Sequence, residues 1–140
     1  MKMILFTAMA ALLLASAGCT SVNSSRNDEA KVVARILAKS ATSPLAFRDQ
    51  GGAQQLLSSL DTSEHFTFGV ILDAKKKVFA SYSRPDQVSE KERFLARVAQ
   101  SVPTGTPETF SLNDGVAISM VRIGVEAETI GYVAVARKAQ

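Results

Sequence analysis

Tryptophan is absent from this chain of 140 residues, and histidine and cysteine occur once each. One histidine cannot form an HxH or HExxH pair, and one cysteine has no partner for an intramolecular disulfide. The adjacent glycines Gly51 and Gly52 lack the Lys-Ser or Lys-Thr that completes a phosphate-binding loop. The sequence therefore predicts no metal, no cofactor and no catalytic residues, and we expect a protein that is not an enzyme.

The chain has only a small excess of positive charge, because it contains 16 basic and 13 acidic residues and its net charge is +3. Lys75, Lys76 and Lys77 form a short basic run, which is typical of a solvated hairpin turn. We therefore expect no nucleic-acid partner. The composition, with 46% hydrophobic residues, fits one globular domain.

The N-terminal segment combines Lys2 with an apolar run from Ile4 to Leu14. This run is too short to span a bilayer, which needs roughly 20 apolar residues, and it predicts a signal peptide over residues 1–18. The following Ala17-Gly18-Cys19 resembles the lipobox of bacterial lipoproteins, in which the cysteine becomes the acylated first residue. Ser16 departs from the usual leucine, and Ala15-Ser16-Ala17 also suits the ordinary signal peptidase, which would release a soluble chain near Gly18.

The lipobox resemblance implies that acylated Cys19 attaches the protein to a lipid membrane. Thr20 stands where an aspartate would favour retention at the inner membrane, so we expect the periplasmic face of the outer membrane. Residues 19–27 predict a lipidated cysteine with a short flexible tether, and residues 28–140 predict the folded domain.

Hydrophobic periodicity predicts three helices: one from Asp28 to Ser40 or Thr42 that Pro44 ends, one from Ala53 to Leu60, and one from Ser89 to Ser101 with Ser89 as its cap. Runs rich in β-branched and aromatic residues predict strands near 66–73, 77–83, 108–112, 116–123 and 130–137, with a turn at 113–115 and a loop at 124–129. The order predicts an α+β fold of PAS/Cache-like type, a five-stranded antiparallel sheet with N-terminal helices and a middle helix. We expect the helices to cover one face of the sheet.

Several local motifs of the chain are similar to those of one protein family. The segment 34–49 reads ARILAKSATSPLAFRD, and FGVILD at 68–73 and VFASY at 78–82 follow it. With TIGYVAV at 129–135, these segments resemble, in order, a CHASE-type periplasmic sensor domain of the eighth class. Lys76 departs from the usual glycine of the hairpin turn, and Ile123 departs from the usual proline.

The best candidates for a ligand site are Tyr82, Arg84 and Arg122, because strand ends converge on the pocket in this fold and arginine can bind a carboxylate or phosphate through two parallel hydrogen bonds. Surface roles for the same side chains stay open. His65, the only imidazole, is predicted to be a loop residue before the first strand.

In the family that the chain resembles, the sensor normally precedes the output domain of a membrane diguanylate cyclase or kinase. This chain ends at Gln140, so we expect it to act by binding such an envelope signalling protein. A structural or assembly lipoprotein is the alternative, and an enzyme with an unfamiliar site is a weaker one. A homodimer through the first helix is left open.

Overall fold

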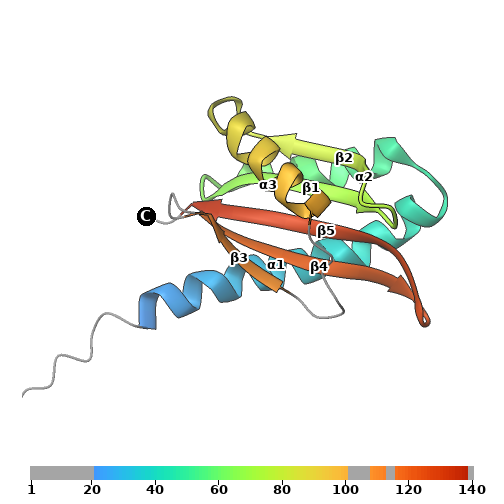
Figure 1. The fold of residues 1–140 in the computed structure, drawn as a ribbon, viewed down its shortest axis with the longest axis horizontal. Coiled ribbons are helices and arrows are strands. Elements are labelled where there is room, and N and C mark those ends of the chain that lie inside the picture. The colour runs from blue at the N-terminus through green and yellow to red at the C-terminus, as the bar shows by residue number, and fades with distance from the viewer. Residues whose placement is uncertain (1–20, 101–107, 113–115, 139–140) are drawn as a thin grey trace, which may run out of the picture.

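The computed structural model describes residues 21–100, 108–112 and 116–138. In this part of the chain, antiparallel strands form a sheet in the order β2-β1-β5-β4-β3, against which three α-helices pack (Figure 1). The elements are α1 (Ser21–Ala46), α2 (Gln50–Ser58), the 3-10 turn η1 (Ser59–Thr62), β1 (Phe66–Asp73), β2 (Val78–Ser83), the 3-10 turn η2 (Pro85–Gln87), α3 (Val88–Gln100), β3 (Glu108–Leu112), β4 (Val116–Val125) and β5 (Glu128–Lys138). The predicted α+β class is confirmed. The predicted turn at 113–115 lies outside the described residues.

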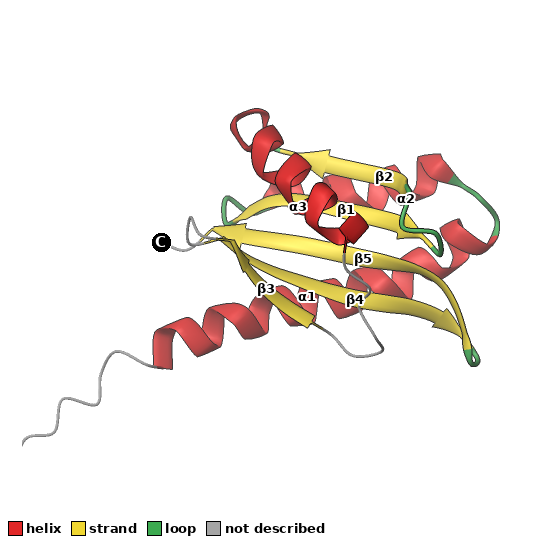
Figure 2. Ribbon diagram, viewed as in Figure 1, coloured by secondary structure: helices red, strands yellow, loops and turns green. Residues whose placement is uncertain are grey.

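Helices cover both faces of the sheet, so the expectation that they share one face was wrong. In Figure 2, α3 crosses in front of the sheet, and α1 and α2 lie behind it. The reason lies in β1, whose residues from Phe66 to Leu72 are all buried. A strand that is apolar on both faces needs a cover on each.

The first helix begins at Ser21 rather than at the predicted Asp28, so residues 21–27 are helical and do not form a flexible tether. No proline or glycine interrupts this segment. Extending an existing helix adds one hydrogen bond for each residue that is fixed, whereas starting a helix is unfavourable. A stable helix after Asp28 therefore favours extension of the same helix back to Ser21.

The same helix continues past Pro44 to Ala46, although the sequence predicted that Pro44 would end it. Proline removes one backbone hydrogen bond and costs a helix interior about 3 kcal/mol. Burial of Ala41 and Leu45, on either side of the proline, holds the last turn against the sheet. Tertiary packing thus outweighs the local penalty.

The second helix starts at Gln50, and the Asp49 carboxylate caps it by accepting the backbone N–H of Gly52 at 2.9 Å. The adjacent glycines Gly51 and Gly52 therefore belong to its first turn. A side chain at position 52 would collide with the Asp49 carboxylate, so glycine leaves room for this cap. The third helix begins at Val88, so the predicted cap Ser89 lies within it.

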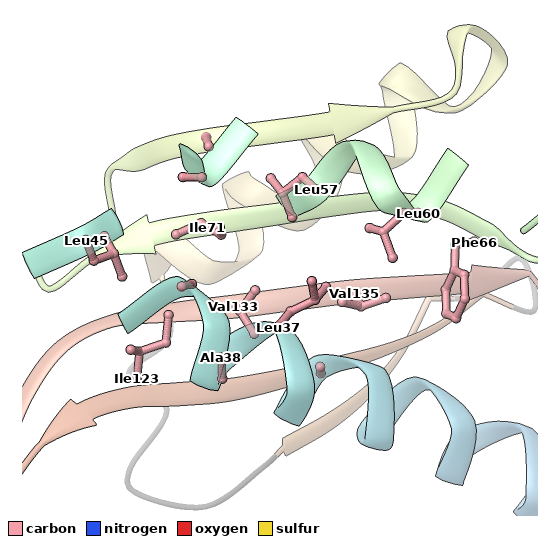
Figure 3. Packing of buried hydrophobic residues seen from close by; sticks show 14 residues of the cluster. Leu37, Ala38, Leu45, Leu57, Leu60, Phe66, Ile71, Ile123, Val133 and Val135 are labelled. Carbon is pink, nitrogen blue, oxygen red and sulfur yellow. The ribbon is translucent and has the colours of Figure 1, made fainter. Parts of the chain in front are cut away.

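The core on the side of α1 and α2 is closely packed through small residues (Figure 3). Alanines of α1 and leucines of α2 and η1 contact the valines and isoleucines of β1, β4 and β5. Gly69 in β1 lies directly under Leu57 and Leu60, and a side chain there would collide with Leu60. We call this side of the sheet the α1 face.

The opposite side, which we call the α3 face, is built around large side chains. Phe68 of β1 and Phe94 of α3 are fully buried, with their ring centroids 5.7 Å apart. Val98 and Leu95 complete the contact surface of α3, whereas Ala99 is exposed.

Candidate functional site

Arg84 lies at the end of β2, where its guanidinium binds the protein's own backbone. Its Nε donates to the Phe66 carbonyl at 2.9 Å, and its Nη2 donates to the Ser63 carbonyl at 2.8 Å. Two charge-assisted hydrogen bonds of this kind fix the loop that leads into β1. In this structure Arg84 holds the loop, and its donors at Nε and Nη2 are already used.

Tyr82, two residues earlier on β2, is bound to η1. Its hydroxyl donates to Asp61 Oδ1 at 2.6 Å. This hydrogen bond, together with partial burial and the Asp61 charge, raises the pKa of the Tyr82 hydroxyl above its usual value of 10.0, and the Arg84 charge opposes the shift. Tyr82 thus joins the end of β2 to the turn after α2.

Arg122 on β4 lines a hollow of about 290 Å³ between α1 and the end of that strand. Its Nη1 donates to Thr129 Oγ1 at 2.8 Å, which orients the guanidinium. Gly124 lies beneath it, because a Cβ at this position would be 3.2 Å from Arg122 Nη2. We call this hollow the Arg122 groove.

Two further cations from α1, Arg35 and Lys39, line the Arg122 groove. They are four residues apart, so they lie on neighbouring turns of one side of the helix. The lining residues that the structure describes include no carboxylate, and the apolar ones are Ala38, Val121 and Ile123. This combination can attract an anion that carries an apolar group.

The structure separates the three predicted site residues. Tyr82 and Arg84 contact the segment that links α2 to β1, whereas Arg122 lines a groove that includes neither of them. Their role in ligand binding stays a prediction. Sequence reasoning missed Arg35 and Lys39, although their four-residue spacing on a predicted helix was a signal that could have found them.

His65 lies in the turn before β1, as predicted, and its carbonyl accepts the backbone N–H of Lys138 at 3.0 Å. Among the described residues, no group of three or more His, Cys, Asp or Glu side chains could hold a metal ion. None of the helices in the described ranges is long and apolar enough to cross a membrane.

The described elements form a small α+β domain whose surface carries a cationic groove beside α1. Residues 22–136 match the model of CHASE8, described as a periplasmic sensor domain. The chain belongs to the CHASE8 family, which confirms the resemblance found in its motifs. No curated protein matches the chain.

The two departures from the family motifs occur at local irregularities of the sheet. Lys76, in place of glycine, adopts a left-handed backbone with φ of 62° in the β1–β2 turn. Ile123, in place of proline, immediately precedes a register shift between β4 and β5. Lys76 therefore keeps the left-handed backbone that glycine usually adopts, and Ile123 lies beside an irregularity in the strand pairing.

Proposed function

We propose that this protein is a non-enzymatic periplasmic sensor module that acts by binding an envelope signalling protein, such as a membrane diguanylate cyclase or kinase. The observation that carries the proposal is the match to a periplasmic sensor family over residues 22–136. We further propose that the fold is of PAS/Cache type. The antiparallel pairing and the succession of two strands, a helix and three strands support this proposal.

The outer surface of α1 is the best candidate for the partner surface. Val32 and Ile36 are 51% and 58% exposed and lie one helical turn apart. Arg35 and Lys39 are exposed beside them. A partner that fits this surface has an apolar centre and acidic residues at its rim.

The Arg122 groove gives a route by which a ligand can influence this surface. Arg35 and Lys39 line the groove and also border Val32 and Ile36 on α1. A ligand that binds these cations more tightly in one placement of α1 than in another favours that placement. A partner bound to α1 then responds to the shift in α1. Arg122 is therefore the predicted site residue that fits a sensor best.

Photo-crosslinking in cells tests the partner surface. A benzophenone amino acid at Ile36 is expected to crosslink to a membrane cyclase, a kinase or a periplasmic regulator that mass spectrometry identifies. Val88 is the matched control, because it is also an exposed β-branched apolar residue. Its side chain is 40% exposed, and it begins α3 on the other face of the sheet. Crosslinks from Ile36 only to murein or assembly machinery, or equal crosslinks from both positions, would support the structural alternative.

We also propose that acylated Cys19 attaches the protein to the outer membrane. The intact mass of protein extracted from membranes is expected to exceed that of the unmodified chain by the mass of the acyl groups. Cys19→Ala should have the unmodified mass and leave the membrane fraction. A wild-type protein without added mass would contradict the anchor and leave the partner proposal standing.

A further inference from the structure

A second hollow, of about 440 Å³, lies where the corner between α1 and α2 meets the β1–β2 turn. Three cations line it: Arg48 from the corner, and Lys75 and Lys77 from the turn. Its apolar wall comes from Leu45, Phe79 and Ile130. We call it the corner pocket. Neither Val32 nor Ile36 lines it, so it is separate from the partner surface.

The corner pocket has a strong excess of positive charge. Among the described residues, Asp73 is the only carboxylate in its lining, and its Oδ1 accepts the backbone N–H groups of Lys75 and Lys77 at 2.9 Å each. This carboxylate is therefore held within the turn. In the described part of the chain, no ion pair involves Arg48, Lys75 or Lys77. Three cations around one hollow favour an anion with more than one negative charge.

We propose that the corner pocket binds a phosphate monoester. Arg48 can donate two parallel hydrogen bonds to the phosphate oxygens, and the two lysines add charge from the opposite side. The substituent of the ester lies against Leu45, Phe79 and Ile130. A carboxylate carries one charge and leaves more of the cationic lining unneutralised, so the phosphate is the better fit.

The backbone offers a matched pair of variants for the test. Arg48 and Lys76 are both cations with a left-handed backbone, with φ of 54° and 62°. Glycine adopts this conformation without strain, so Arg48→Gly and Lys76→Gly each remove one positive charge and preserve the fold. Arg48 lines the corner pocket, and Lys76 does not.

Isothermal titration calorimetry of the full-length protein in non-ionic detergent tests the proposal with phenyl phosphate. We expect saturable binding that is about tenfold to hundredfold weaker in Arg48→Gly and within about twofold of wild type in Lys76→Gly. Inorganic phosphate should bind about tenfold more weakly than phenyl phosphate, because it leaves the apolar wall uncovered. Thermal unfolding of both variants checks that they are folded.

Dioctanoyl phosphatidic acid in the same titration distinguishes a phosphate monoester of a membrane lipid from a soluble phosphate monoester. Tighter binding of the lipid supports a membrane phosphate monoester, and tighter binding of phenyl phosphate supports a soluble one. The proposal fails if neither compound binds, or if Arg48→Gly and Lys76→Gly weaken binding equally. The partner proposal is untouched by either result, because the crosslinking experiment reads a different surface.

Discussion

The two faces of the sheet are packed in opposite ways. On the α1 face, α1 contributes Ala34, Ala38 and Ala41 to the core cluster, and two glycines of the sheet, Gly69 and Gly131, let the helices approach the strands. On the α3 face, a single helix is held mainly by Phe94 and Val98. One face depends on small residues that allow close approach, and the other depends on large residues that fill space.

This difference predicts which kind of substitution destabilises each face. A closely packed interface has no room for added atoms, so an enlarged side chain should damage the α1 face. An interface held by a few large side chains should be damaged when one of them is removed. The proposed partner surface and both polar hollows include residues of α1 or of the corner that follows it.

The largest effect is expected for Phe94→Ala, which removes the central side chain of the α3 face. Phe94 is 1% exposed and packs against Phe68. Loss of a buried phenyl ring typically lowers the free energy of unfolding by about 3–5 kcal/mol. Urea unfolding measures this loss.

Amide hydrogen exchange on the same variant shows whether the two faces are separable. Exchange should increase in α3 and stay slow in the buried part of α1 around Ala38, which packs on the other face. Phe94→Leu is the control and should lose less than half as much stability. A loss below about 1 kcal/mol in Phe94→Ala would contradict the comparison.

An intermediate effect is expected for Gly131→Ala on the α1 face. The added Cβ would collide with the Leu72 backbone carbonyl and lie 2.8 Å from Leu45 Cδ1. Because the backbone of a central strand cannot move aside easily, the free energy of unfolding should fall by about 2–3 kcal/mol in urea.

Gly51→Ala is the matched control for this prediction. Its added Cβ would meet only Asp49 Oδ1 at 3.5 Å, an ordinary contact, and Gly51 lies within α2. Alanine favours a helix over glycine by about 1 kcal/mol, so this variant should be slightly more stable than wild type. Equal effects of the two substitutions would show that close approach at Gly131 is unimportant.

The sequence predicted most of the elements because their signals are local. The alternating and continuous apolar runs place β1 at its observed bounds, Phe66–Asp73. The errors occur where tertiary contacts decide. Burial of Leu45 keeps the helix intact beyond Pro44, and the two-sided burial of β1 draws α3 to the opposite face.

The candidate site was harder to predict, because it depends on contacts between distant segments. Nothing local in the sequence shows that Arg84 binds the Ser63 and Phe66 carbonyls, or that Tyr82 binds Asp61. The Arg122 groove and the corner pocket each combine residues from α1 with residues from strands far along the chain. Such juxtapositions follow from the fold and not from any one motif.

The smallest effect is expected for Tyr82→Phe, at the rim of the α1 face. The variant loses the hydrogen bond to Asp61, which is worth about 0.5–1 kcal/mol at neutral pH. The folded state raises the pKa of this hydroxyl above 10.0, so its stabilising contribution is complete below pH 10.0 and is lost as pH rises through the folded-state pKa. The stability difference between wild type and variant should therefore be constant well below pH 10.0 and narrow as the pH rises above 10.0 in urea unfolding. A difference that stays constant over this range would show that Tyr82 supports the rim by packing alone.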